Sequence, residues 1–425
     1  MRRAAICLLA VCLTAGGCSS KPARKSAKSE RRTLRVAVLF TTAGQGGDLA
    51  QAVLGAAGLV GEKAKQAGVT LNIIQEDYAG NVARVPALLN DAKSKADAIV
   101  VGTNDPAVEP ALRATKDIPI LYPLLSDDSL LAGADNAFRF GPSNKLQADA
   151  LIGYLVTKRK YRKIAFLTDD TNFGKEGRAD LTNALGAAGY GPVLDTTFRP
   201  GGDIHTPVAH AGQENAEALV VWTANENEAA RIVVEAHKLS FGFQIALSGN
   251  LANSVFAKNA TAQVTPVAFR DGLLSVGPWA GPWFRLKRII AFYRAFQEEN
   301  SALAPVQAAS VYDAVLALVR AARDVGTTPA DLTTGIESLK NFTGAGVPLT
   351  FGSDKHEGMD EDDIALYAYT KDQDSAGGDF APEVDTGGGF FTILHSSLNL
   401  PQNLAYLAGD ISPSEAPSAE GSPSP

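Results

Sequence analysis

Apolar and polar positions along the chain follow two alternating patterns, one typical of strands and one typical of helices. Residues 34–40 (LRVAVLF) form a β-branched run that predicts a buried strand, and the alanine-rich residues 47–66 predict a helix. The same patterns continue to residue 122, with strands predicted at 69–76, 98–102 and 119–122 and helices at 82–94 and 107–115. Such βαβ repetition requires a parallel sheet with helices on both faces.

A second series of strands and helices begins after residues 138–142 and repeats the first. Strands are predicted at 163–168, 193–198, 218–222 and 244–248. Helices are predicted at 145–157, 177–188 and 226–239, and a further helix is expected to end near residue 211. Two doubly wound sheets in tandem place the carboxyl ends of their strands toward one crevice, where ligands of such sheets bind. The predicted fold class is therefore α/β, with two doubly wound parallel-sheet lobes.

The last third of the chain is expected to complete these two sheets and not to form a third domain. Helices are predicted at 284–297 and 307–325, a strand and turn at 348–358, and strands at 364–369 and near 390–394. We expect lobe 1 to comprise residues 33–139 and 284–347, and lobe 2 residues 140–283 and 348–400, joined by several hinge crossings. Residues 272–283 (GLLSVGPWAGPW) would form a hinge, with Trp279 and Trp283 packed between the lobes.

The first eighteen residues have the pattern of an export signal. Two arginines precede a short apolar run, and small residues lead up to Cys18. The run is shorter than the roughly 20 residues that a membrane-spanning helix needs. Residues 13–18 (LTAGGC) resemble a bacterial lipobox, so we expect residues 1–17 to be a lipoprotein signal peptide and Cys18 to carry acyl chains. Ordinary secretion with cleavage near Gly17 is the alternative.

Composition limits the compartment and the partners. The cysteines are Cys7, Cys12 and Cys18, so the mature chain would hold one thiol and no intramolecular disulfide. The formal charge of −7 becomes −9 without the two arginines of the signal, which argues against a nucleic-acid partner. Residues 18–32 are basic and serine-rich, as in a flexible tether, and residues 401–425 form a Pro/Ser-rich tail that we expect to be disordered.

Several segments together are similar to those of a known family. They are the strand 36–39 with the glycine-rich loop 42–47, the strand end at 76–77, and residues 100–105, 122–130, 169–177 (DDTNFGKEG) and 310–314. Over roughly residues 33–394 the chain resembles the type I periplasmic, or extracytoplasmic, solute-binding proteins of the leucine/isoleucine/valine type. The resemblance implies a two-lobed clamp, anchored at the membrane through Cys18, that closes on a small solute and delivers it to an ABC transporter permease. It implies no catalytic activity and no cofactor.

The resemblance also implies a set of ligand-binding residues. They are Thr103, Asn104 and Asp105 at the end of the third strand, Ser126 and Asp127 after the fourth, and Phe173, Asn225, Glu226 and Asn250 on the second lobe. Ser126 matches a threonine that binds the amino-acid head of the family's ligands, and Phe173 matches an aromatic residue that covers the ligand. Asn225 and Glu226 match a position where the family often has tyrosine, and Asn250 falls near the acid that pairs with the ligand ammonium.

Two departures from the family pattern affect the expected solute. Asn250 is not acidic, so an α-amino acid would lack its usual anionic partner unless Glu226, Asp105 or Asp127 supplied it, and a buried ammonium without a partner is costly. Leu124 and Leu125 replace the small residues that bring backbone close to a ligand carboxylate. We therefore expect a small polar solute, such as an amino acid, an amide or a urea-like compound.

Simpler interpretations exist for the same residues. Asp105 and Asp127 are also suited to cap helix N-termini, and Phe173 to pack in the core. The sequence has no Walker A loop, no His-Glu-x-x-His and no nucleophile elbow, and the pair His205 and His210 is better explained as solvated than as a metal site. An envelope hydrolase therefore lacks support. A sensory or regulatory lipoprotein that uses the same clamp to control an envelope protein is the alternative function.

Overall fold

The computed structural model describes residues 32–44, 46–251, 256, 260, 273–278, 287–301, 304–370 and 379–382. Several sequence predictions lie outside these residues: the signal peptide, Cys18, Trp279, Trp283, the strand near 390–394 and the tail 401–425.

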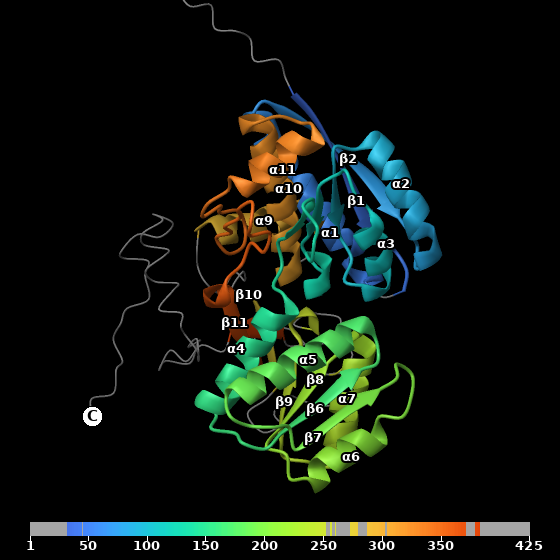
Figure 1. Ribbon diagram of the computed structural model, residues 1–425, viewed down its shortest axis with the longest axis vertical. Helices are drawn as coiled ribbons and strands as arrows, with labels where there is room; N and C mark the ends of the chain where they lie inside the picture. The colour runs from blue at the N-terminus through green and yellow to red at the C-terminus, as the bar shows by residue number, and fades with distance from the viewer. Residues whose placement is uncertain are drawn as a thin grey trace, which may run out of the picture. The chain divides into compact units, whose positions relative to one another are not determined.

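The first half of the described chain forms a sheet of five strands in the order β2-β1-β3-β4-β5 (Figure 1). The strands are β1 (Arg32–Phe40), β2 (Val69–Asp77), β3 (Ala98–Val101), β4 (Ile120–Tyr122) and β5 (Ala137–Arg139). All four neighbouring pairs are parallel. β3 and β4 are buried along their whole length because both faces of the sheet are covered, which explains their continuous apolar sequence.

Helices cover both faces of this first sheet. They are α1 (Ala50–Gln66), α2 (Val85–Lys95), α3 (Glu109–Ala114), and, from later in the chain, α9 (Lys287–Asn300), α10 (Val306–Asp324) and α11 (Pro329–Glu337). Side chains alternate across a strand, so Val36 and Val38 of β1 pack in the core that α1 and α10 share. Ala37 and Leu39 pack on the other face with apolar residues of α2 and α3. We call this sheet and its helices lobe 1.

The second sheet has the order β12-β11-β10-β9-β8-β6-β7. Its strands are β6 (Ile164–Asp169), β7 (Leu194–Phe198), β8 (Ala218–Trp222), β9 (Gln244–Leu247), β10 (Leu273–Pro278), β11 (Ile364–Thr370) and β12 (Asp379–Pro382). The pairs from β7 to β10 are parallel, and β11 is antiparallel to both of its neighbours. Its helices are α4 (Asn144–Thr157), α5 (Asn172–Ala187), α6 (His205–Gln213) and α7 (Glu226–Lys238). We call this sheet with these helices lobe 2.

The chain passes between the lobes repeatedly. Among the described elements the passages lie between β5 and α4, between β10 and α9, and between α11 and β11. The first and the third passage touch, because Arg139 and Glu357 form an isolated parallel bridge. The predicted fold class, two doubly wound lobes joined by several crossings, is confirmed. No described helix combines the length and the apolar character that crossing a membrane requires.

The structure differs locally from the predicted elements. α5 begins at Asn172, five residues earlier than predicted, because Thr171 caps it by accepting a hydrogen bond from the backbone of Gly174. Residues 273–278, expected to be part of a hinge, form β10, and residues 348–358 form isolated bridges instead of a strand. β5 and α11 were not predicted, since a three-residue strand and a short polar helix carry little periodic signal.

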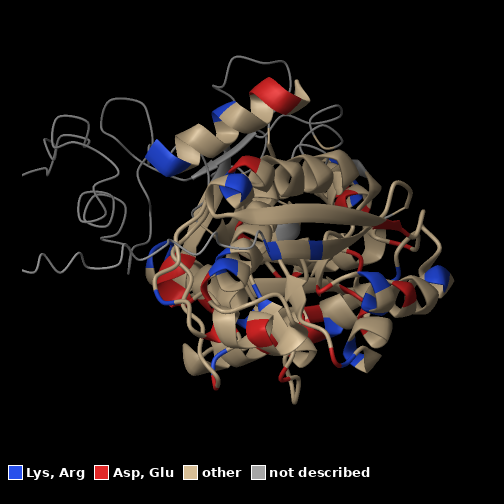
Figure 2. Ribbon diagram, turned by 90° about the horizontal axis from the view of Figure 1, so that it is seen from above, with Lys and Arg blue, Asp and Glu red and all other residues tan. Residues whose placement is uncertain are grey.

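Charged residues of both signs are interspersed over the helices and loops of the described chain (Figure 2). Ion pairs between exposed groups, such as Lys145 with Asp149 and Arg320 with Asp324, link neighbouring turns of single helices. Pairs of this exposed kind contribute little to folding stability, about 0.5 kcal/mol each. The folded structure of each lobe is therefore stabilised mainly by its apolar core.

Close packing of α5 on β8 depends on a glycine. A Cβ atom at Gly177 would lie 2.0 Å from Nε1 and 2.1 Å from Cδ1 of Trp222, whose indole is fully buried. The rigid indole has no free space into which it could move, because buried side chains surround it. Gly177 therefore sets how closely the helix approaches the sheet in lobe 2.

We expect Gly177→Ala to lower the free energy of unfolding by about 1–3 kcal/mol, because the added methyl group overpacks this contact. Gly186→Ala, near the end of the same helix, is the matched control. No atom lies within 4 Å of its added methyl group, so this variant should be neutral or up to about 1 kcal/mol more stable than wild type. Urea unfolding of both variants provides the measurement, and a Gly177→Ala protein as stable as wild type would contradict the packing argument.

Candidate functional site

The loops that follow strand ends of both lobes enclose a narrow cavity of about 50 Å³. Lobe 1 contributes Asn104 after β3, Leu124 and Ser126 after β4, and Gln307 and Ser310 on α10; lobe 2 contributes Gln147 on α4, Gly249 after β9, Pro278 and Tyr367. One water needs about 10–15 Å³ by this measure, whereas sites for larger ligands take about 300–1,000 Å³. The lobes therefore lie closed upon each other in this conformation, with room for a compact group.

Two larger hollows lie elsewhere on the described surface. One, of about 650 Å³, runs along α1 and α10, and the other, of about 610 Å³, lies beside Asp128 and Glu357. Neither brings together the carboxyl ends of strands from both sheets, which is where doubly wound folds bind ligands. The narrow cavity is therefore the candidate site.

The loop after β3 is held by a buried tyrosine. The hydroxyl of Tyr78 lies 2.9 Å from the hydroxyl of Thr103 and donates to a carboxylate oxygen of Asp105 at 3.2 Å. Burial raises the pKa of Tyr78, and burial also raises the pKa of Asp105. Asp105 in addition caps the short helix η3 (Pro106–Val108) through the backbone of Ala107. Thr103 and Asp105 thus shape the loop and leave the neighbouring Asn104 to face the cavity.

Asn104 connects the two lobes directly. Its amide nitrogen donates to a carboxylate oxygen of Glu226, the first residue of α7, at 3.4 Å. Its amide oxygen is buried and has no hydrogen-bond partner among the described residues. Asn104 is only 6% exposed and this oxygen lies against Gly46, so it can accept from a bound group only if the side chain turns.

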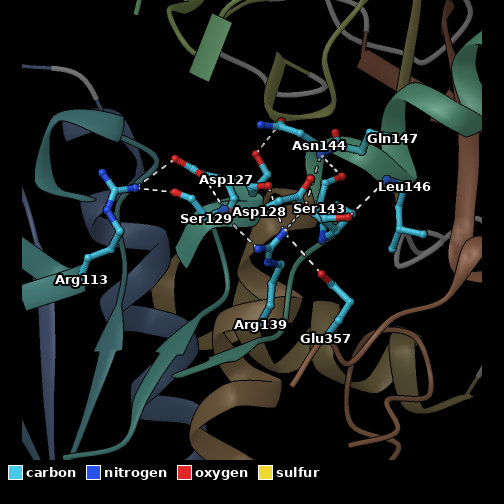
Figure 3. Close-up of polar contacts among 12 residues, drawn as sticks. Arg113, Asp127, Asp128, Ser129, Arg139, Ser143, Asn144, Leu146, Gln147 and Glu357 are labelled. Carbon is cyan, nitrogen blue, oxygen red and sulfur yellow. Dashed lines mark hydrogen bonds and ion pairs between the residues drawn. The ribbon is translucent and has the colours of Figure 1, made fainter. Parts of the chain in front are cut away.

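Ser126, in the loop after β4, lines the cavity. Figure 3 shows the neighbouring Asp127 and Asp128 with their partners. The Ser126 hydroxyl donates to the amide oxygen of Asn144 on α4 at 3.0 Å, and the Ser126 carbonyl accepts from the backbone of Asn144 at 2.8 Å. Asp127 is directed away from the cavity: it caps η4 (Asp128–Leu130) through the backbone of Ser129 and lies 3.5 Å from the guanidinium of Arg113.

Three carboxyl groups meet where α5 of lobe 2 approaches this loop. Glu176 on α5 and Glu109 on α3 both lie close enough to Asp127 to affect its pKa, an approach of three acids that favours protonated glutamates. Burial and the nearby Asp127 raise the pKa of Glu176 to about 9 and that of Glu109 to about 10. Burial alone would raise the pKa of Asp127, but hydrogen bonds from Glu176, Glu109 and Ser129 lower it to about 2. The contact between the lobes at this place therefore depends on a bound proton.

A chain of hydroxyl groups supports the strand ends of lobe 2. The Thr223 hydroxyl donates to Asp169 at 2.6 Å, the Ser248 hydroxyl to the Thr223 carbonyl at 2.9 Å, and the Ser275 hydroxyl to the Ser248 carbonyl at 3.1 Å. All four residues are buried. Gly249 follows this chain, and its backbone donates to the side-chain oxygen of Gln147 at 2.9 Å. The cavity wall of lobe 2 is thus fixed by paired polar groups.

Phe173 and Asn225, also predicted for ligand binding, are not among the residues that line the cavity. Phe173 is 5% exposed and stacks on Trp222 with ring centroids 6.1 Å apart, so it belongs to the core of lobe 2. Asn225 caps α7 by accepting from the backbones of Asn227 and Glu228. Asn250 lies in η5 (Gly249–Leu251), and its side chain is outside the described residues. Of the predicted set, Asn104 and Ser126 line the cavity and Glu226 reaches it through Asn104.

The sequence analysis missed several polar residues of the site. Gln147 lines the cavity from the first turn of α4, the helix that follows a passage between the lobes, and Gln307 and Ser310 line it from the first half of α10. A polar residue in the first turn after a predicted crossing is the signal that could have identified Gln147. Among the described residues, no group of three or more His, Cys, Asp or Glu side chains is arranged to hold a metal ion.

A protein-family model described as periplasmic binding protein matches residues 33–374. The chain belongs to the periplasmic binding protein family. No curated protein sequence was similar enough to count as a relative of this periplasmic binding protein.

Solved structures share the fold of this periplasmic binding protein. The leucine-binding protein LivK from Thermotoga maritima is 17% identical, with a TM-score of 0.71 over 82% of this chain and 97% of its own. The branched-chain amino acid binding protein LivJ from Streptococcus pneumoniae, solved with isoleucine, is 18% identical, with a TM-score of 0.67 over 83% and 100%. A solute-binding protein from R. palustris, solved with benzoate, is 17% identical, with a TM-score of 0.69 over 82% and 95%.

The carboxyl contact between the lobes predicts a pH dependence. A glutamate whose pKa is raised from 4.5 to about 9 contributes stability that is fully present below about pH 4.5 and is lost as the pH rises through about 9. The melting temperature should therefore fall between about pH 5 and about pH 9, and the fall should be smaller in Glu176→Gln, because an amide donates to Asp127 without taking up a proton.

Glu62→Gln, a change of an exposed residue on α1, provides the control and should keep the wild-type pH profile. Thermal unfolding across this pH range is the measurement. Identical pH slopes for Glu176→Gln and wild type would show that the shared proton does not stabilise the contact.

Proposed function

We propose that this periplasmic binding protein is a lipid-anchored, extracytoplasmic substrate-binding protein of an ABC importer. It clamps a small polar solute between its lobes and delivers the solute to a permease in the membrane. The observation that carries the proposal is the cavity at the strand ends, to which both lobes contribute polar groups. Because each lobe supplies part of the contacts, the solute binds the closed arrangement better than the open one and so drives closure.

The solute class follows from the groups that face the cavity. Its described polar side chains are the amides of Asn104, Gln147 and Gln307 and the hydroxyls of Ser126, Ser310 and Tyr367. Amides and hydroxyls both donate and accept hydrogen bonds, so they suit a solute that carries N–H and C=O groups. This supports an amino acid, an amide or a urea-like compound. The small volume further favours a compact molecule.

The membrane anchor rests on Cys18 and the lipobox-like residues before it. Residues 19–31 separate Cys18 from β1, so an extended tether allows the body to stand up to about 50 Å from the anchor. The family of the chain implies an extracytoplasmic location, and such a tether would keep the clamp within reach of a permease.

One observation favours the sensory or regulatory lipoprotein as a second candidate. The lobes already contact each other through Asn104 and Glu226, and Leu124 occupies part of the cavity lining. Direct contact between the lobes and an apolar residue in the lining reduce the polar surface open to a solute, which suits a protein that signals to an envelope partner. The two candidates differ in whether any solute stabilises the protein.

A thermal-shift screen with L-amino acids, their amides and urea derivatives tests the transport function. We expect a saturable rise in melting temperature for one of these classes, since a ligand at about 100 times its Kd stabilises the folded state by about 2.7 kcal/mol. Asn104→Ala and Ser126→Ala should each weaken the effect, because each removes a polar group from the cavity.

The control for these variants is Ser94→Ala. This exposed serine on α2 bonds only its own helix, through the Asp91 carbonyl at 2.8 Å, so the change should leave the ligand-induced shift intact. Absence of a shift with every class would reject solute transport for these compounds and favour the regulatory candidate.

The anchor is tested separately with Cys18→Ser. We expect this variant to lose incorporation of labelled palmitate and to leave the membrane fraction, because the thiol that carries the acyl chains is gone. Cys12→Ser, inside the predicted signal peptide, should incorporate label like wild type. Release of both variants from the membrane fraction, or of neither variant, would contradict lipidation at Cys18.

A further inference from the structure

Arg139, the last residue of β5, lies beneath the loop that presents Ser126 (Figure 3). Its side chain is fully buried, and its guanidinium donates to two backbone carbonyls of that loop, to Ser126 at 3.0 Å and to Asp127 at 2.7 Å. It also contacts the carboxylates of Asp128 at 2.9 Å and of Glu357 at 3.3 Å. A single side chain therefore connects the binding loop with a distant segment.

That distant segment belongs to a hinge. Arg139 is the last strand residue before the chain crosses from lobe 1 to lobe 2, and Glu357 lies on the crossing between α11 and β11. The backbone of Arg139 is joined to the same crossing: its N–H donates to the His356 carbonyl at 2.9 Å, and its carbonyl accepts from Gly358 at 3.1 Å. Side chain and backbone of one residue thus hold two crossings and the binding loop together.

We propose that Arg139 is the positioning residue that fixes the Ser126–Asp128 loop to the hinge, so that the loop and the two crossings move as one body when the lobes open and close. The functional meaning of this role rests on the proposed solute binding, but the order of the loop does not. Arg139 gives each of the two carbonyls a charge-assisted hydrogen bond in addition to the one from a backbone amide. Only a planar fork with several N–H groups serves both carbonyls and a carboxylate at once.

A purely charge-balancing role for Arg139 makes different predictions. In that case the partners that matter are the Asp128 and Glu357 carboxylates, a lysine would serve nearly as well, and removing the Glu357 charge would disturb the structure as much as changing Arg139. The contacts argue otherwise, because the shortest of the four goes to the Asp127 carbonyl. Lysine, with one compact ammonium group, would lose at least one of the two carbonyls.

Backbone amides next to the loop provide a readout that needs no solute. The amide of Leu130 donates to the Asp127 carbonyl at 3.2 Å, and the amide of Asn144 donates to the Ser126 carbonyl at 2.8 Å. The amide of Ser129 donates to the Asp127 carboxylate at 2.7 Å. Loosening of the loop weakens all three bonds, so hydrogen exchange at these amides reports its order directly.

The experiment compares hydrogen exchange of the full chain in wild type, Arg139→Lys, Arg139→Met and Glu357→Gln. Arg178→Lys is the matched control, because Arg178 on α5 forms an equally close two-pronged pair with Asp195 in lobe 2. We expect Arg139→Lys to speed exchange at Ser129, Leu130 and Asn144 about ten-fold or more, with amides inside α10 unchanged. Glu357→Gln and Arg178→Lys should leave the three loop amides near wild-type rates.

Wild-type exchange at the three amides in Arg139→Lys would overturn the proposal, as would a Glu357→Gln variant that loosens the loop as much as Arg139→Lys does. If Arg139→Met does not fold, the Arg139→Lys and Glu357→Gln variants still test the proposal. A loosened loop in a protein that no solute stabilises would uphold the positioning role while rejecting the proposed transport function. If a solute stabilises the protein but the loop amides of Arg139→Lys exchange at wild-type rates, the proposed transport function is upheld and the positioning role is rejected.

Discussion

The structure around the candidate site depends on one constraint: polar groups buried between the lobes must be paired. Strand ends bring backbone carbonyls, hydroxyls, amides and carboxylates into a region that excludes most water. Unpaired buried polar groups cost about 1–3 kcal/mol each, so every hydrogen bond formed in this region favours the arrangement. Tyr78, Arg139 and Gln147 are buried and supply these partners from below the loops, and each serves two or more groups at once.

The same constraint explains which groups stay available to a solute. Ser126, Asp105 and Asn225 each have a backbone or side-chain partner within the protein. Asn104 has one partner for its amide nitrogen and none for its buried oxygen among the described residues. A site of this kind selects a ligand through the few groups that the scaffold leaves unpaired, whereas the paired groups maintain its shape.

Sequence patterns predicted the fold well because its sheets are buried on both faces. β8 (Ala218–Trp222) matches the predicted residues 218–222, and β1 and β2 extend the predictions by no more than two residues at either end, since continuous β-branched runs bounded by turns have few alternatives. The resemblance to the solute-binding family, and not the periodic pattern, indicated Asn104 and Ser126, which lie in the cavity lining. Phe173 was assigned to the ligand, but the early start of α5 turns its ring onto Trp222. Arg139 carried no periodic signal, since its role depends on Glu357, far along the chain.

Charge at the site distinguishes the kinds of solute that the closed arrangement accepts. Arg113 lies within 3.5 Å of Asp127 and the two glutamates beside it share protons, so these acids are compensated away from the cavity. Among the described acids, Glu226 is the one bonded to a cavity-lining side chain. A solute ammonium would have to take the place of the Asn104 amide at Glu226, which breaks the contact between the lobes. A solute whose ammonium is absent or directed elsewhere leaves that contact intact, because it does not compete for the Glu226 carboxylate.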